Sequence, residues 1–265
     1  MSDAKTEFPA ERYLQPSTYI DSESPEVLQL TREALAGLDG ASTTERSIRL
    51  FEAVRDGLRY DPYSFAVQAD AYRASAIARQ ESAFCVPKAI LLTACLRAAG
   101  IPAAVGFADV RNHLNSPKLA DLMGTDLFIY HGYVQLWLDG VARKVTPAFN
   151  MELCERFGVG PLLFDGRSDA LFHEFDADNR RHMEYVNDRG IHLDPPIDEL
   201  LAAFRTTYPR LVEFTERRIA GPDAAIEDAS FPGTAIRKGD APADRAEGRL
   251  SSSRNGLAQK GEYNE

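Results

Sequence analysis

The chain has 265 residues, a formal net charge of −10 and 44% apolar residues, which is an ordinary composition for a globular protein. The carboxylate excess argues against a nucleic-acid partner, because neutralising phosphates requires clustered Lys and Arg side chains. The apolar runs are too short to cross a membrane and the N-terminus lacks a signal-peptide pattern, so we predict a cytoplasmic protein without a membrane partner.

The first part of the chain is predicted to be mainly helical. Residues 1–23 look irregular, and a cap, a first-turn proline and a first-turn acid begin a helix over residues 24–38. A second helix starts near Thr44 and repeats apolar residues at steps of three and four. A weaker helix is expected around 70–80. The apolar face of the second helix consists of Ile48, Phe51, Val54 and Leu58.

The third strong helix is the most apolar segment of the chain. It runs from about residue 86 to residue 99 and is stopped by Gly100 and Pro102. Its apolar residues lie almost all round the helix, with Lys88 and Arg97 as the main exceptions. We therefore expect this helix at the centre of the core.

Strand patterns follow the apolar helix. Strands are predicted at 103–110 and 127–138, and Asp139-Gly140 is a tight-turn signal that leads into a strand at 141–146. Because helices precede the sheet, the predicted fold class is α+β. Two more strands are expected, at 161–165 and 182–186.

The C-terminal part is predicted to contain one interrupted helix and a tail. The helix covers residues 197–214 and is broken at Pro209. From residue 219 the chain loses large apolar residues, so 219–265 is expected to be disordered. The domain prediction is a lead-in with a helix at 1–40 and a main domain with a C-terminal extension at 41–218.

Three cysteines occur without the spacing of a disulfide framework, so each is expected to be a free thiol. Cys85 directly precedes the apolar helix, where unpaired N–H groups and the helix dipole favour the thiolate. We therefore predict that Cys85 is the reactive cysteine, with a buried structural thiol as the alternative. Cys95 is expected to fill the core. The third cysteine is Cys154.

A cysteine nucleophile needs a base, and His131 lies within a predicted strand. A two-residue turn would pair Tyr133 with Thr146, which places Thr146 one diagonal step from His131 on the same sheet face. The hydroxyl of Thr146, or the amide of Asn150, is the predicted partner that orients the imidazole. The alternative for His131 is a half-buried strand histidine without a catalytic role.

The motif that joins these residues begins with Tyr60 and ends with His131 before the hairpin. Its dense part reads Cys85-x-x-Lys88-Ala89-x-Leu91-Leu92-x-Ala94-x-Leu96-Arg97-Ala98-x-Gly100-Ile101-Pro102-Ala103. Over roughly residues 20–150 the chain resembles the transglutaminase-like superfamily of the papain-like cysteine fold. The resemblance implies a central cysteine-bearing helix packed on an antiparallel sheet, and a Cys-His-Asp triad that hydrolyses or transfers amide groups through a thioester.

The resemblance assigns Cys85 as the nucleophile and His131 as the base. The family's aspartate position carries Thr146, whose hydroxyl accepts an imidazole N–H but holds no charge; papain-like proteases use an amide there, as Asn150 would. For the oxyanion, the backbone N–H of Cys85 is expected to act with one side chain. The two candidates are Gln80, as in papain-like enzymes, and Tyr60 or Tyr63, as in transglutaminases.

The leading functional prediction is a cysteine hydrolase or acyltransferase that acts on a peptide, a protein side chain or a small amide. One alternative is a catalytically degenerate domain that binds a peptide or protein partner. The other is transfer of an acyl group to a small amine, as in the arylamine N-acetyltransferases. No cofactor is implied, and no metal is expected because the spacing of His173, His182 and His192 matches no ligand motif.

Overall fold

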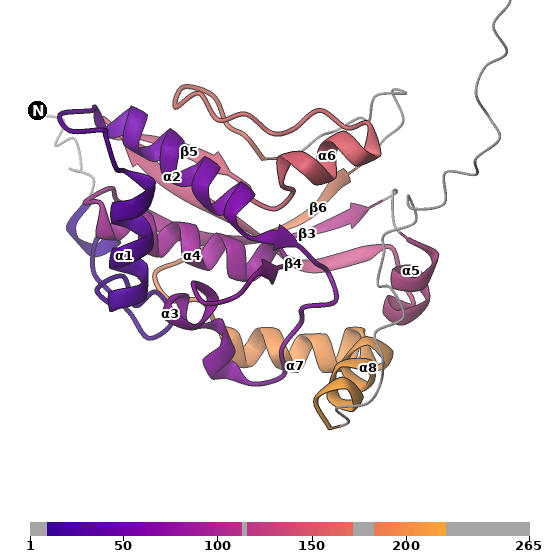
Figure 1. The fold of residues 1–265 in the computed structure, drawn as a ribbon. Coiled ribbons are helices and arrows are strands. Elements are labelled where there is room, and N and C mark those ends of the chain that lie inside the picture. The colour runs from indigo at the N-terminus through magenta and orange to yellow at the C-terminus, as the bar shows by residue number, and fades with distance from the viewer. Residues whose placement is uncertain (1–9, 113–115, 172–182, 221–265) are drawn as a thin grey trace, which may run out of the picture. The chain divides into compact units, whose positions relative to one another are not determined.

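The computed structural model describes residues 10–112, 116–171 and 183–220 of the chain (Figure 1). It combines helices with a four-stranded antiparallel sheet, so the predicted α+β class is confirmed. The tail expected at 219–265 lies outside the described residues from position 221 onward.

The N-terminal helices form largely as the sequence predicted. A 3-10 turn, η1, covers Ala10–Tyr13, and helix α1 covers Pro25–Ala34, so it ends four residues earlier than expected. Helix α2 covers Thr43–Gly57 and begins with a capping box, in which the Ser42 hydroxyl accepts the Glu45 N–H and the Glu45 carboxylate accepts the Ser42 N–H.

The helix expected around 70–80 is wrong as a single element. The segment instead forms the 3-10 turn η2 at Ala69–Tyr72 and the short helix α3 at Ala74–Ile77, separated by an extended Arg73. Two hydrogen bonds outside the helical pattern accompany the break. The buried Tyr72 hydroxyl donates to the Ala66 carbonyl, and the Ala74 N–H donates to the Tyr19 carbonyl.

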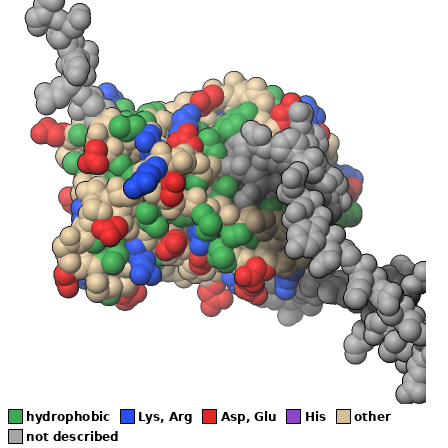
Figure 2. Space-filling view, turned by 90° about the horizontal axis from the view of Figure 1, so that it is seen from above, with side chains coloured by type: hydrophobic (Ala, Val, Ile, Leu, Met, Phe, Trp, Pro, Cys, Tyr) green, Lys and Arg blue, Asp and Glu red, His purple; other side chains and the backbone are tan. Residues whose placement is uncertain are grey.

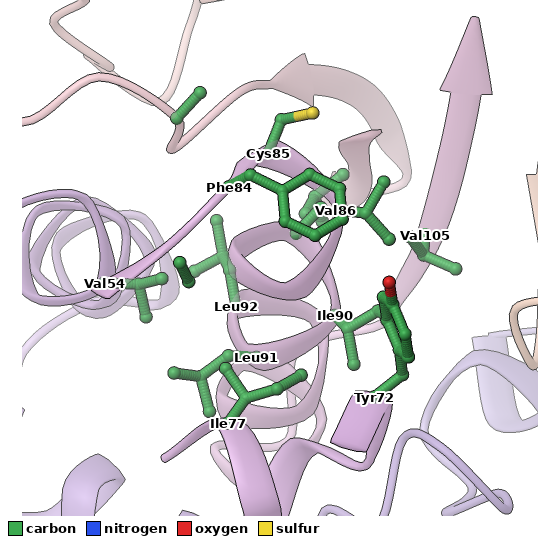
Figure 3. Packing of buried hydrophobic residues seen from close by; sticks show 14 of the residues in the cluster. Val54, Tyr72, Ile77, Phe84, Cys85, Val86, Ile90, Leu91, Leu92 and Val105 are labelled. Atoms are coloured by element: carbon green, nitrogen blue, oxygen red, sulfur yellow. The ribbon is translucent and has the colours of Figure 1, made fainter. Parts of the chain in front are cut away.

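Helix α4, Cys85–Ala98, is the central element of the fold, as predicted. It packs on strands β3 and β4 on one side and on α1, α2 and α3 on the other (Figures 1 and 3). Its two cationic side chains lie in the interior and donate to backbone carbonyls. Lys88 donates to Arg55 and Leu58 at the end of α2, and Arg97 donates to Gln15, Ala103 and Leu193.

The main sheet has the strand order β5-β4-β3-β6 and is antiparallel throughout. The hairpin register is confirmed: Leu138 pairs with Val141, and the ladder continues to Val134 opposite Val145. The strands are β3 at Ala103–Asn112, β4 at Leu127–Leu138, β5 at Val141–Val145 and β6 at Met183–His192.

The strand expected at 161–165 does not form. That segment is irregular, and the chain reaches the sheet only further on, where Ala170 makes a single parallel bridge with Val145. A separate two-stranded parallel sheet joins β1, Arg59–Tyr60, to β2, Ser82–Ala83, and thereby fixes the segment that leads into Cys85.

The described residues contain four further helices after β3. The helix predicted at 197–214 with a break at Pro209 is confirmed as two helices that meet at Tyr208. Two short helices were not predicted. The bounds are α5 at Pro117–Met123, α6 at Met151–Phe157, α7 at Ile197–Thr207 and α8 at Pro209–Ala220.

Candidate active site

Cys85 is the first residue of α4, whereas the sequence predicted it directly before a helix that starts at about residue 86; Phe84 is the N-cap instead. The preceding Phe84 is extended, so the chain leaves β2 and enters the helix without an intervening loop. In Figure 3 the Cys85 sulfur lies at the end of the helix and points away from the apolar side chains that pack along it. The fold therefore places the thiol at the boundary between the core and a cavity.

Gly132 allows β4 to approach the start of α4 very closely. A Cβ atom at this position would lie 2.9 Å from the Val86 Cα and 3.0 Å from the Cys85 carbonyl oxygen, both of which are backbone atoms. Such contacts are too short for any residue larger than glycine unless the strand moves. The close approach brings His131, the neighbour of Gly132, to the end of the helix that carries the thiol.

Cys85 and His131 line one cavity of about 50 Å³. Both side chains are buried, with 7% and 4% of their surface exposed. Tyr60 lines the same cavity, so one of the two oxyanion candidates lies beside the thiol. The two residues on which the functional prediction depends, far apart in the sequence, are thus brought together by the packing of β4 on α4.

Thr146 lies on the other side of the imidazole. His131 and Thr146 line a second, smaller cavity of about 10 Å³, although the predicted pairing of Tyr133 with Thr146 does not form because the ladder ends at Val134 and Val145. The Thr146 hydroxyl is buried and has no hydrogen-bond partner among the described residues. Its backbone N–H donates to the Ala170 carbonyl, which ends β5 at this point.

Asn150 and Gln80 line neither of these two cavities. The side-chain amide oxygen Oδ1 of Asn150 accepts the backbone N–H of Tyr60 at 3.1 Å, and the ring of Phe149 packs edge-on against the Tyr60 ring with their centroids 4.7 Å apart. Asn150 therefore holds Tyr60 in place. Gln80 is partly buried at the end of α3, where its N–H donates to the Ile77 carbonyl.

A bulge in β4 directly precedes His131. Ala108 pairs with His131 but Val110 pairs with Phe128, so β4 contains one residue more than β3 between these pairs. The extra length is absorbed at Tyr130, whose φ of +55° lies in the left-handed region that non-glycine residues rarely adopt. The conformation just before the imidazole is therefore strained and needs support.

Asp109 and Arg189 supply that support. The Asp109 carboxylate, 6% exposed, accepts the Tyr130 N–H at 3.1 Å and the Arg189 Nε–H at 2.6 Å. The Arg189 guanidinium lies 4.1 Å from the centre of the Tyr130 ring. Sequence analysis missed this group because nothing in the residues around Asp109 indicates a bulge on the neighbouring strand.

Tyr208 closes the other side of the bulge. Its hydroxyl accepts the Ile129 N–H at 2.6 Å and donates to the Leu127 carbonyl at 2.8 Å. The two amides that leave the β3 ladder, those of Ile129 and Tyr130, thus find partners in a tyrosine hydroxyl and a carboxylate. Two contacts therefore hold the segment before His131 in place. Asp109 binds it from strand β3, and Tyr208 binds it from the junction of α7 and α8.

The protonation state of the pair differs from the sequence prediction. The helix start was expected to favour the Cys85 thiolate, but burial raises the thiol pKa to about 11, even though the amides of Gly132, Val86 and Cys85 itself act to lower it. Burial also lowers the pKa of His131 to about 4. At neutral pH the site therefore holds a neutral thiol and a neutral imidazole.

We expect the alkylation of Cys85 by iodoacetamide in the variant His131→Gln, where no imidazole can take the thiol proton, to accelerate steadily as the pH is raised from 7 to 10. With a thiol pKa of about 11, the thiolate fraction grows about tenfold per pH unit across this range. Rates measured by peptide mapping report Cys85 separately from Cys95 and Cys154. A plateau below pH 8 would show instead that the thiolate is already formed.

The stability of the protein is expected to decrease in mild acid because of His131. Its pKa is about 4 when folded and 6.5 as a free side chain, so between these values the unfolded chain binds a proton that the folded chain does not. The expected loss is about 2 kcal/mol between pH 7 and pH 4.5. Urea unfolding of the wild type and of His131→Gln at pH 7 and pH 4.5 measures this loss of stability. An equal loss in the variant would show that His131 is not its cause.

Among the residues that the structure describes, the remaining thiols and histidines show no second site of this kind. All three cysteines are free and buried. Within the described residues no group of three His, Cys, Asp or Glu side chains is arranged to hold a metal, and His192 stacks near Phe107. His173 and His182 lie outside the described residues. Every helix in the described ranges is too short or too polar to cross a bilayer.

Comparisons with known proteins cover part of the chain. The model of the Transglutaminase-like superfamily matches residues 29–142, which include α4 with Cys85 and β4 with His131. A search of curated proteins gave no match. Among solved structures, a proposed cysteine protease from Cytophaga hutchinsonii is 14% identical with a TM-score of 0.39, over 69% of this chain and 54% of that chain. The chain thus spans about half the length of that structure.

Proposed function

Residues 29–142 belong to the transglutaminase-like superfamily, and on this premise we propose that the protein is a cysteine hydrolase or acyltransferase that cleaves an amide or peptide bond. The observation that carries the proposal is the cavity shared by Cys85 and His131. The proposed catalytic domain is residues 41–218, and the proposed location is the cytoplasm, where three free thiols stay reduced.

Because the thiol and the imidazole are both neutral, attack on the substrate requires general-base catalysis. The Cys85 sulfur forms a bond to the substrate carbonyl carbon while the neutral His131 takes the thiol proton. His131 then returns that proton to the leaving amine as the carbon–nitrogen bond breaks, which leaves an acyl thioester on Cys85. Water or a second amine finally takes the acyl group and restores the thiol.

The developing oxyanion is proposed to be stabilised by the backbone N–H of Cys85 and by the Tyr60 hydroxyl. Burial, and then the neighbouring Cys85, raise the pKa of Tyr60, so its hydroxyl remains a hydrogen-bond donor at all relevant pH values. Asn150 supports this role indirectly, because it fixes the backbone of Tyr60. Gln80 is the less favoured candidate, since it does not line the cavity.

Thr146 is proposed to orient the imidazole in place of the usual acid. Its hydroxyl is buried beside His131, and a hydroxyl can accept an imidazole N–H. It adds no negative charge to stabilise an imidazolium, so the proposed enzyme would be slower than one with an aspartate at this position.

One observation favours the alternative of a degenerate domain that binds a peptide without turnover. Burial raises the Cys85 pKa to about 11, so no thiolate stands ready in the free protein. In either case the partner is proposed to be a peptide, a protein side chain or a small amide. Figure 2 shows acidic and basic side chains interspersed on the visible described surface, which supports the expectation that nucleic acid is not the partner.

Trapping of an acyl-enzyme tests the proposal. The protein is mixed with p-nitrophenyl butyrate, and p-nitrophenol release is followed together with intact mass and peptide mapping. The expected result is a burst of one p-nitrophenol per protein and one butyryl group on Cys85, absent in Cys85→Ala. A wild-type protein that gains no butyryl group at Cys85 would favour the degenerate domain.

A further inference from the structure

The cavity above Cys85 has walls that the superfamily core does not supply. Residues 29–142 contribute the thiol, the imidazole and one wall, but α7 and α8 lie after this segment and close the opposite side. The wall from α7 and α8 consists of Phe204, Tyr208 and Leu211. The wall from α5 consists of Leu119 and Met123.

The lining of this cavity is apolar on almost every side. None of the described residues that line it is an Asp, Glu, Lys or Arg. The Tyr208 hydroxyl is already bonded to Leu127 and Ile129, so Tyr208 presents its ring rather than a free polar group. A charged substrate group placed here would lose its hydration without gaining a partner, which is unfavourable.

The two C-terminal helices are fixed to the rest of the protein. Arg210 on α8 forms an ion pair with Asp121 on α5 at 2.9 Å, and Arg218 donates to the Tyr63 carbonyl at 3.0 Å. Tyr208 is bonded to β4, as described above. The apolar wall is therefore built into the fold and stands directly beside the thiol.

The size of the cavity limits what can enter it. Its volume is about 50 Å³, and one water-sized group needs about 10 to 15 Å³ of such space, so about four non-hydrogen atoms fit. This is the size of a short or branched aliphatic chain. An aromatic ring or a long acyl chain would extend beyond the space between these walls.

We propose that α7 and α8 form the specificity pocket of the enzyme. This pocket takes an uncharged aliphatic group of about four carbons next to the reacting carbonyl, such as the side chain of Val or Leu or a butyryl group. Because it names the substrate class, this inference rests on the proposed function. The pocket itself is a binding site for apolar groups whether or not the thiol turns over.

Thiol-directed reagents test the pocket without requiring catalysis. Cys85 is treated with methyl, n-butyl and n-octyl methanethiosulfonate and with the charged 2-sulfonatoethyl and 2-(trimethylammonio)ethyl reagents. Each rate at Cys85, obtained by peptide mapping, is divided by the rate of the same reagent with free cysteine. The normalised rate of the n-butyl reagent is expected to be at least about tenfold higher than that of either charged reagent. It is also expected to be at least about tenfold higher than that of the n-octyl reagent.

Variants connect the preference to the wall. Leu211→Trp is expected to remove the advantage of the n-butyl reagent by filling the pocket, and Met123→Ala is expected to admit the n-octyl reagent. Leu163→Ala is the matched control, because Leu163 is 70% exposed and does not line the cavity. Equal normalised rates for all reagents, or a preference unchanged in Leu211→Trp, would overturn the inference.

The outcomes separate this inference from the proposed function. An n-butyl preference together with an acyl-enzyme from p-nitrophenyl butyrate supports both. The preference without any acyl-enzyme keeps the apolar pocket and contradicts the proposed reaction. An acyl-enzyme without the preference keeps the reaction and overturns the assignment of α7 and α8 as the specificity pocket.

Discussion

Replacing Gly132 with alanine is expected to abolish acylation of Cys85. The added methyl group would lie 2.9 Å from the Val86 Cα and 3.0 Å from the Cys85 carbonyl oxygen, and neither backbone atom can rotate away. Strand β4 must therefore move from the start of α4, and His131 moves with it. We expect acylation by p-nitrophenyl butyrate to fall more than about 100-fold and the free energy of unfolding to fall by about 2 kcal/mol.

The control is Gly57→Ala. Gly57 ends α2, has a negative φ, and a Cβ atom there would meet no atom within 4 Å. This variant should retain both acylation and stability. If Gly132→Ala acylates at the wild-type rate, the close contact between β4 and α4 does not position the imidazole.

Replacing Asp109 with leucine is expected to cause the second largest loss. The substitution leaves the strained Tyr130 without an acceptor for its N–H and leaves Arg189 without its buried partner. We expect the free energy of unfolding to fall by about 3 kcal/mol, since one partner of a largely buried pair is removed. Acylation should fall more than about tenfold, because His131 directly follows the bulge.

A conservative variant separates positioning from stability. Asp109→Asn keeps an oxygen that can accept the Tyr130 N–H, so it should recover most of the acylation rate even though it remains less stable than the wild type. Asp70→Ala is the control, because the Asp70 to Arg73 pair is exposed, lies away from the cavity and should contribute less than about 1 kcal/mol. If Asp109→Leu acylates at the wild-type rate, Asp109 has no part in placing His131.

The parts of the fold that could be predicted are those whose signals are local. The start of α4 follows from Cys85 and Pro87, and the pairing of Leu138 with Val141 follows from the tight turn between them. The split between η2 and α3 could not be found in this way, because the Ala74 N–H leaves the helical pattern to donate to the carbonyl of Tyr19, a residue far away in the sequence.

The bulge at Tyr130 could not be predicted from the sequence for a related reason. A non-glycine residue with positive φ has no sequence pattern of its own, and the groups that stabilise it, Asp109, Arg189 and Tyr208, come from three different elements. Only the folded chain brings them to the same point on β4.

The protonation of Cys85 was mispredicted because two effects compete and the sequence displays only one of them. A helix N-terminus stabilises an anion by about 0.3 to 1 kcal/mol. Burial of a thiol can raise its pKa by several units, and for Cys85 it prevails. The residues that cover the thiol include Phe204 and Leu211, more than 100 positions later in the chain, so their effect could not be read from the motif.

The most direct test of the central claim, that Cys85 and His131 act as one catalytic pair, is the pH dependence of butyryl transfer to Cys85 in wild type and His131→Gln. With a neutral imidazole as base, the wild-type rate should be constant from about pH 6 to pH 9 and should fall in acid with an apparent pKa near 4. In His131→Gln the rate should be much lower and should rise about tenfold per pH unit, following the thiolate of a group with a pKa of about 11. Two parallel profiles that both rise with pH would contradict the pairing.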